Sequence, residues 1–217
     1  RLEISEGAEL SVASSGVGDG GSLTIKCSYL DVIRNAELKS SSYGFGEAGS
    51  IDLSVSRELN LLDHSVVSVS SLQADGGDIL INSKGLNIGD SGLLASSGRD
   101  GGSVTILSNG NAVLSSSIVS SEALNNGGNI EIRSNRTLIL KKSNLRANAI
   151  RGKGGNISVA VDGFLPSVDS LISASSEFGL EGSIEIDTPD TNVGSGIIIL
   201  PNKIEDKSIN LAERCQL

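Results

Sequence analysis

Seven similar hexapeptide motifs divide the chain into segments of nearly equal length. Each motif starts with small residues, usually a glycine pair, and continues as an alternating polar and aliphatic stretch, as in residues 20–25 and 127–132. The second residue of each motif is a glycine: Gly21, Gly49, Gly77, Gly102, Gly128, Gly155 and Gly182. Successive marker glycines are 28, 28, 25, 26, 27 and 27 residues apart. A repeat of this length predicts a solenoid, in which each period forms one coil that stacks on the next.

Each period also contains two further short stretches with alternating apolar residues. Examples are residues 30–32 with Leu38, residues 59–61 with Val67, and residues 86–88 with Leu94. Period-two alternation is typical of strands with one buried face. Three such strands fit one triangular coil, whose strands pair in parallel with the next coil at a spacing of about 4.8 Å. We therefore predict an all-β fold, a right-handed parallel β-helix of about seven three-strand coils.

The leucine-rich repeat is the nearest competing solenoid, because its period of about 20 to 29 residues overlaps this one. That repeat needs a helical segment in its convex half and an Asn at the end of its strand. Here the positions equivalent to Asn35 hold His64 and Ser91, and the rest of each period is rich in Ser and Gly with strand-like alternation. These features favour the β-helix.

The same register predicts which side chains lie inside a coil and which lie at its corners. Cys27 falls on the apolar face of its strand, so we expect it to be a small buried hydrophobe. We expect glycine at the corners because it permits positive φ. Asn129 is predicted to lie above Ser103 and below Asn156, so that these polar side chains share hydrogen bonds from coil to coil.

The repeat ends at Ile186, which predicts two regions. Residues 1–186 are expected to form the β-helix. Residues 187–217, with Pro189, Pro201 and two glycines, are expected to form an irregular cap or exit linker. A cap would cover the unpaired backbone edge that the last coil exposes.

Charge and composition exclude several classes of protein. The chain has 17 basic and 26 acidic residues, a formal net charge of −9, so we expect no nucleic-acid binding. The longest aliphatic run, residues 197–200, is far too short for a transmembrane segment. Cys27 and Cys215 lie in no CxxC motif, which disfavours a zinc or redox site, and we predict no cofactor. The start at Arg1 suggests a piece of a longer polypeptide.

Motifs near the C-terminal end resemble the C-terminal region of filamentous-haemagglutinin-like exoproteins of cyanobacterial type. The resemblance covers about residues 172–215 and rests on Ser173-Ala174-Ser175-Ser176-Glu177-Phe178-Gly179, Gly182, Glu185-Ile186-Asp187-Thr188-Pro189-Asp190, Leu200-Pro201 and Cys215. It implies a long right-handed β-helix, export through an outer-membrane two-partner secretion transporter, and an extracellular or cell-surface location. It also implies adhesion to cell-surface or extracellular glycans or proteins.

A polysaccharide-active enzyme is an alternative, because pectin lyases and polygalacturonases are similar in architecture. Such chemistry needs paired carboxylates, or a base supported by a carboxylate-bound metal or by arginine. Asp19, Asp75 and Asp100 each precede a glycine pair and can form a column, but Asp before Gly is also ordinary turn chemistry. His64, beside Asp63, has no nucleophile motif nearby and is predicted to lie in an exposed turn. We predict no catalytic and no metal-binding residue.

Seven basic residues lie within 21 positions that contain no acid. This basic band consists of Arg133, Arg136, Lys141, Lys142, Arg146, Arg151 and Lys153. It is either an ordinary solvated surface or a contact site for anionic glycans or an acidic partner. Phe45 and Phe178 occupy the same corner of different coils and are predicted to cover it, with Tyr43 nearby.

The sequence thus predicts a structural and adhesive segment of a large secreted surface protein. It is not expected to be an enzyme. The alternatives are a β-helix lyase or hydrolase acting on polysaccharides, and a passive module that binds anionic glycans.

Overall fold

The computed structural model describes residues 1–97 and 99–189, which form strands and turns without a helix. The larger of two sheets contains β1 (Leu2–Ile4), β3 (Leu23–Val32), β5 (Ile51–Leu62), β7 (Ile79–Gly89), β9 (Val104–Ser108), β10 (Ala112–Ser115), β12 (Asn129–Lys141), β14 (Asn156–Pro166) and β16 (Ser183–Asp187). The second contains β2 (Glu9–Ser14), β4 (Glu37–Ser42), β6 (Val66–Ser71), β8 (Gly92–Ser97), β11 (Ile118–Ser120), β13 (Asn144–Arg146) and β15 (Leu171–Ser173).

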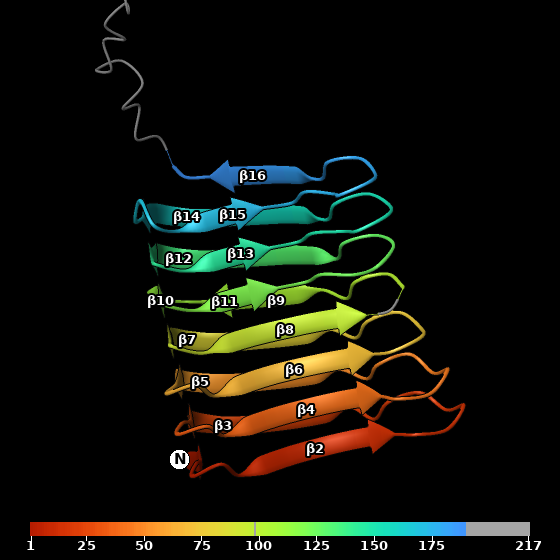
Figure 1. Cartoon of the computed structure of the whole chain (residues 1–217). Helices are drawn as coiled ribbons and strands as arrows, with labels where there is room; N and C mark the ends of the chain where they lie inside the picture. Colours follow the sequence, from red (N-terminus) through yellow and green to blue (C-terminus); the bar gives the residue numbers. More distant parts are fainter. Residues whose placement is uncertain (98, 190–217) are drawn as a thin grey trace, which may run out of the picture.

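The two sheets wind around a common axis as a parallel β-solenoid of about seven coils (Figure 1). Strands from successive coils pair in parallel, for example β4 with β6 and β6 with β8. In Figure 1 the strands of the second sheet run to the right while β16, in the first sheet, runs to the left, and the chain rises from β2 to β16. This is right-handed winding, so the predicted fold class is confirmed.

Each coil has three extended segments, but the first two are usually one bent strand. Among the described coils, only the one that contains β9, β10 and β11 has three separate strands. In β3, β5 and β12 the pairing register shifts at residues 27–29, 55–58 and 134–137. We call this bend the bulge corner. A bulge of one extra residue bends a strand sharply without ending its pairing, which explains why three predicted strands form two sheets.

One predicted core position was wrong by a residue. Leu93, not Leu94, pairs in register with Val67 and Val119 and is fully buried. The preceding corner explains the shift, because Asp63 and His64 both have positive φ whereas the next coil uses Asp90 alone. The shorter corner moves the following strand forward by one residue, and a one-residue shift exchanges the two faces of a strand.

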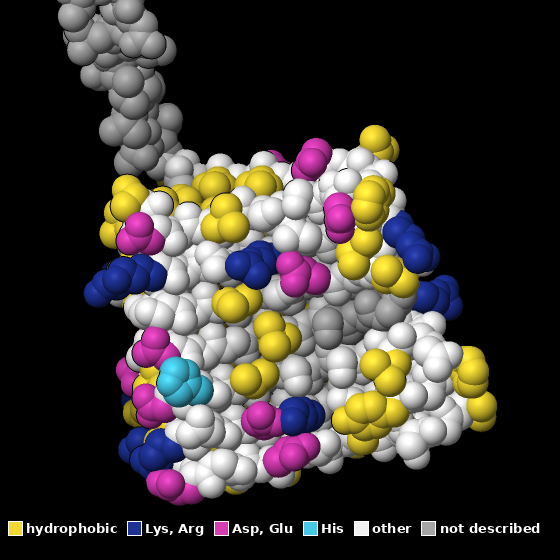
Figure 2. Space-filling model, in the orientation of Figure 1, with side chains coloured by type: hydrophobic (Ala, Val, Ile, Leu, Met, Phe, Trp, Pro, Cys, Tyr) yellow, Lys and Arg dark blue, Asp and Glu magenta, His cyan; other side chains and the backbone are white. Residues whose placement is uncertain are grey.

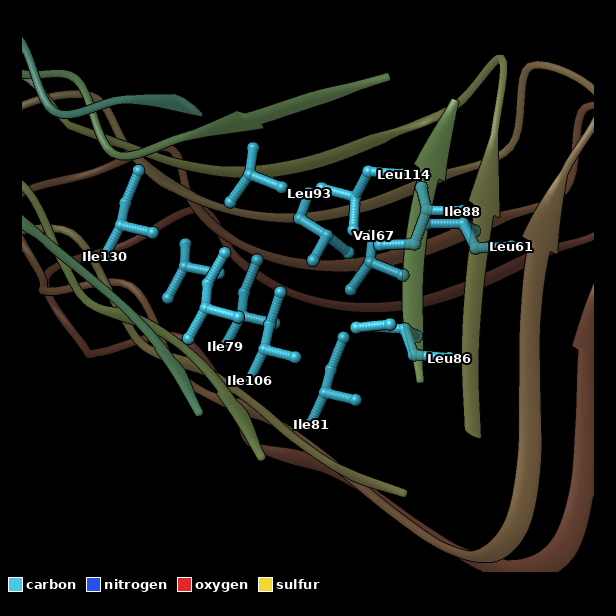
Figure 3. Packing of buried hydrophobic residues seen from close by; sticks show 14 of the residues in the cluster. Leu61, Val67, Ile79, Ile81, Leu86, Ile88, Leu93, Ile106, Leu114 and Ile130 are labelled. Atoms are coloured by element: carbon cyan, nitrogen blue, oxygen red, sulfur yellow. The ribbon is translucent and has the colours of Figure 1, made fainter. Parts of the chain in front are cut away.

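The core consists of columns of aliphatic side chains, one from each coil. Leu61, Ile88 and Leu114 pair in register, are 0% exposed, and lie side by side in Figure 3. Each inner coil therefore buries its apolar face against equivalent residues above and below, whereas Ile184 and Ile186 of the last described coil are 47% and 42% exposed. Each such side chain contributes roughly 1.5 to 3 kcal/mol on burial.

Buried serines satisfy the backbone at the inner corner between the sheets. The Ser65 hydroxyl accepts a hydrogen bond from the N–H of Ala36 at 3.1 Å, and that of Ser143 accepts one from Ser117 N–H, also at 3.1 Å. Both serines are fully buried. A backbone donor without a partner would be costly in this dry position, so these serines stabilise the corner.

The marker glycines are required for a different reason from the one expected. Among the described glycines only Gly7 has a positive φ, at 71°. Instead, a Cβ at Gly49 would overlap the carbonyl oxygen of Gly21 one coil below, and a Cβ at Gly77 would overlap that of Gly49. The same holds for Gly102, Gly128, Gly155 and Gly182, while a Cβ at Gly21 would overlap Val12. Close stacking of backbone on backbone, and not positive φ, excludes side chains from this column.

Polar side chains beside that column form the predicted ladder in part. Asn156 donates to Oδ1 of Asn129 at 2.9 Å, and the Ser183 hydroxyl donates to Oδ1 of Asn156 at 2.7 Å. Within the described structure no hydrogen bond joins Ser103 to Asn129; the N–H of Ser103 donates to Asp78 Oδ1 at 2.8 Å. The lower step of the predicted ladder was therefore wrong, although a serine at the equivalent position, Ser183, does bond to the asparagine of the neighbouring coil.

The last described strand, β16, ends at Asp187, one residue beyond the predicted boundary. Most of the predicted cap, residues 190–217, lies outside the described residues, as do Cys215 and the end of the family-like motif. Across the described ranges, no helix has the length and apolar character needed to cross a membrane.

Candidate functional site

The column of aspartates before the glycine pairs forms as predicted, and its carboxylates bind backbone. Asp19 Oδ1 accepts a hydrogen bond from the N–H of Glu47 at 3.0 Å, and Asp75 Oδ1 accepts one from the N–H of Asp100 at 3.4 Å. Asp75 also pairs with Arg99 at 3.3 Å. Both carboxylates therefore accept a backbone hydrogen bond from the next coil, as expected for an aspartate that precedes glycine in a turn. No group of three or more His, Cys, Asp or Glu that could hold a metal occurs in the described part of the chain.

His64 lies in an exposed two-residue turn between β5 and β6. Its φ is 61° and that of Asp63 is 57°, and its backbone N–H donates to the carbonyl of Asp90 at 2.8 Å. Figure 2 shows the histidine on the surface near this corner. The position agrees with the predicted exposed turn.

Cys27 packs against the core but is only half-buried, so its predicted burial is incomplete. Its thiol donates to the carbonyl oxygen of Tyr29 at 3.3 Å. Desolvation raises the pKa of the thiol, with a smaller contribution from the negative charge of Asp31 and an opposing one from the N-terminal amine. A raised pKa leaves less of the reactive thiolate at neutral pH.

The basic band belongs to one coil and surrounds it. Arg133 lies on the first half of β12, and Arg136 lies at the bulge corner. Lys141 and Lys142 lie at the next corner, and Arg146 lies on β13. Arg151 and Lys153 lie in the following loop. Arg133 also pairs with Glu131. Because these residues lie on different sides of the coil, they do not form one patch.

Phe45 and Phe178 do not cover the corner as predicted. They lie in loops that lead from the second sheet to the next coil, and they are 72% and 75% exposed. Tyr43 is 56% exposed beside Phe45. Figure 2 shows apolar side chains gathered along the right-hand edge of the rod, where these loops run in Figure 1. The glycine-rich tips lie too far out for an aromatic ring to reach the core.

Two neighbouring hollows lie along the bulge corner on the opposite side of the larger sheet from the core. One, of about 560 Å³, is lined by residues that include Asn60, Asn87 and Val113. The other, of about 340 Å³, is lined by Tyr29, Arg57, Lys84, Gly110 and Arg136, among others. Glu58, Gly85 and Asn111 line both hollows, so together they form one continuous depression, the corner groove.

The corner groove exists because the bulge corner varies between coils. One residue, Lys84, separates the paired positions in β7, whereas two, Ser56 and Arg57, separate them in β5. Gly85 occupies the position that Glu58 occupies one coil below. Without a side chain at Gly85, the floor of the groove stays open. Long side chains from the neighbouring coils form its rim.

Polar groups in the corner groove include several that lack partners. Arg57 lies over the Tyr29 ring, with 5.7 Å between the guanidinium carbon and the ring centroid. Arg57, Lys84 and Arg136 form no ion pair with any residue that the structure describes. Below the groove, the Asn60 amide donates to Asp31 Oδ1 at 2.7 Å. The groove thus offers three cations without an ion-pair partner among the described residues, beside the exposed amides of Asn87 and Asn111. Asn111 Oδ1 accepts a hydrogen bond from the N–H of Thr137 at 3.4 Å.

Comparisons of the chain with protein-family models, with curated proteins and with solved structures found no match.

Sequence reasoning identified the turn glycines and the aspartate column but did not find the corner groove. Of the basic band, only Arg136 reaches it. The other residues that line the corner groove come from coils about 27 residues apart, at a bulge whose length changes from coil to coil. The available signal was weak: glycine at positions 85 and 110, each next to a polar or charged residue.

Proposed function

We propose that this chain is a structural and adhesive segment of a large secreted surface protein, similar to a filamentous-haemagglutinin-like adhesin. The main support is the continuous parallel stacking of its coils, from β1 to β16, which persists across the register shifts at the bulge corner. At about 4.8 Å per coil this stack extends roughly 34 Å. Such a rod places side chains at fixed, repeated positions on a long surface, which suits extension and contact.

The proposed location is extracellular, with export through an outer-membrane two-partner secretion transporter. Support comes from the resemblance of residues 172–215 to that family, of which residues 172–189 are described. The proposed contacts are glycans or proteins of a cell surface or matrix. The groups exposed along the loop edge, including Phe45 and Phe178, offer apolar contact area for such partners.

Attachment under flow tests the adhesive role. Beads coated with the chain are passed over bacterial, algal and animal cell layers and over matrix proteins. The control is Ile81→Asp, which places a carboxylate in a fully buried position and unfolds the central coils. Retention of beads with the folded chain on at least one surface, and loss of retention with Ile81→Asp, is expected. Equal retention of both, or of neither, contradicts the proposal.

A polysaccharide lyase or hydrolase is the alternative for this architecture. The aspartate column gives it little support, because Asp19 and Asp75 accept hydrogen bonds from backbone within the rod. Assays for reducing ends and unsaturated products on pectin, alginate and related polymers test it directly. Turnover that disappears in Asp75→Asn or Asp100→Asn would establish the enzyme and reject a purely adhesive role.

A further inference from the structure

We propose that the corner groove binds an acidic polysaccharide chain that lies along the axis of the rod. The inference deepens the glycan contact of the proposed function, on which it rests, by naming a site and an acidic class of glycan. Attachment through proteins or through the loop edge would not need this groove, so the two proposals can fail separately. The inference rests on the shape of the groove, on its unpaired cations, and on the spacing of its lining residues.

The shape suits a linear polymer. The two hollows share Glu58, Gly85 and Asn111, and the lining runs from Tyr29 on β3 to Arg136 on β12. That distance covers four coil steps, or about 19 Å at about 4.8 Å per coil. A depression of this length, open at its surface and with no side chain on its floor at Gly85, accommodates several sugar units without enclosing the end of a chain.

The charge of the groove is opposite to that of the rod. Its lining contains three cations (Arg57, Lys84 and Arg136) and one carboxylate (Glu58), a difference of 3 minus 1, or +2, on a chain of net charge −9. The Tyr29 ring holds the Arg57 guanidinium at the rim. Unpaired cations attract carboxylate or sulfate groups and bind them with charge-assisted hydrogen bonds.

The asparagine amides and the Glu58 carboxylate of the groove suit sugar hydroxyls. Asn87 and Asn111 are exposed. The Asn87 amide can both donate and accept hydrogen bonds, whereas Asn111 Oδ1 accepts one from the N–H of Thr137, which leaves its NH₂ group to donate. The Glu58 carboxylate accepts hydrogen bonds from hydroxyl groups. Amides, a carboxylate and an aromatic ring supply the donors, acceptors and apolar surface that bind a polyhydroxylated ring. Three cations and one carboxylate give too little positive charge for the denser phosphates of a nucleic acid.

The spacing favours a glycan over a peptide. Lining residues repeat once per coil, at about 4.8 Å, which is comparable with the length of one pyranose unit in an extended chain. An extended peptide repeats at about 3.3 Å per residue and loses register with the coils within a few steps. Backbone pairing cannot compensate, because the strands that form the groove already pair on both sides, as β5 does with β3 and β7.

Gly85 allows a test that fills the groove and leaves the fold intact. A Cβ at Gly85 meets only Cγ of Glu58, at 3.5 Å, an ordinary contact, and its φ is not positive. Gly92, on β8 in the same coil, is the control: it is more buried than Gly85, but a Cβ there meets nothing closer than 3.6 Å. Gly85→Leu fills the floor of the groove, while Gly92→Leu adds the same side chain on the second sheet.

The experiment measures binding of the full chain to polygalacturonate, alginate and a sulfated glycosaminoglycan by calorimetry at physiological ionic strength. Neutral dextran and single-stranded DNA are the comparison polymers. We expect at least one acidic glycan to bind, dextran and DNA to bind at least about tenfold more weakly, and Gly85→Leu to weaken glycan binding about tenfold or more. Gly92→Leu is expected to bind as the unmodified chain does.

A charge test keeps the proposal falsifiable if Gly85→Leu does not fold, as checked by circular dichroism. Arg136→Gln removes an exposed groove cation, and Lys142→Gln removes an exposed cation of the same coil at another corner. Arg136→Gln is expected to weaken binding about fivefold to tenfold and Lys142→Gln to leave it unchanged. The proposal is overturned if no acidic glycan binds, if DNA binds as tightly, or if the paired variants have equal effects.

Discussion

Asp100 accepts two hydrogen bonds from Asn126 in the next coil, from its backbone N–H at 3.1 Å and from its side-chain amide at 2.8 Å. Asn126 in turn accepts a hydrogen bond from the N–H of Lys153 at 2.9 Å. Side chains that precede the glycine pairs thus connect three successive coils. They satisfy backbone donors that the sheets leave unpaired, so the column stabilises the edge where the loops return to the larger sheet.

Replacing Asp100 by alanine is expected to lower the free energy of unfolding by about 1 to 3 kcal/mol, because the N–H of Asn126 loses its acceptor. Asp100→Asn keeps an acceptor oxygen and is expected to cost about half as much or less. Urea unfolding followed by circular dichroism measures both. Equal losses for the two variants would show that charge, and not the hydrogen bond, matters at this position.

Gly49→Ala is expected to destabilise the rod by about 3 kcal/mol or more. Its Cβ would overlap the carbonyl oxygen of Gly21, and neither backbone can move without breaking its pairing. Gly16→Ala is the control, since a Cβ there meets nothing within 4 Å, and its stability is expected to change by less than about 1 kcal/mol. Thermal melting compares the variants; a tolerated Gly49→Ala would refute the steric explanation for the marker glycines.

Leu61→Ala and Leu62→Ala test the direction of alternation in β5. Leu61 is 0% exposed and lies in a core column, so its truncation is expected to cost about 2 to 5 kcal/mol. Leu62, on the opposite face, is half-buried, and its truncation is expected to lower the free energy of unfolding by roughly 1 kcal/mol or less. Denaturant unfolding of both variants gives the comparison. The reverse order would place the core on the wrong face of the strand.

Cys27 is expected to react slowly with iodoacetamide at neutral pH. Desolvation raises the pKa of its thiol, so the rate is expected to keep increasing with pH beyond the usual range of a free cysteine near 8.5. The Cys215→Ser variant isolates this thiol, and a short cysteine peptide is the reference. The folded state holds the proton more tightly than the unfolded chain, so this group leaves stability unaffected below the usual thiol pKa and reduces it above. An inflection below that of the peptide would contradict the assignment.

Sequence alone determined the period, the direction of the apolar faces and the column of glycines. It did so because every coil repeats the same short-range requirements: alternation for burial, and a small residue where backbones stack. The reason for the glycines became clear only in three dimensions, since the overlap at Gly49 involves Gly21, 28 residues away.

Tertiary structure alone decided where the irregular positions lie. A single left-handed residue at Asp90, in place of two at Asp63 and His64, moved Leu93 into the core. A bulge of one or two residues brought Arg57, Lys84 and Arg136 to one groove. Local pattern does not record such changes in length, because the number of residues at a corner is set by how each coil must bend to remain paired with its neighbours.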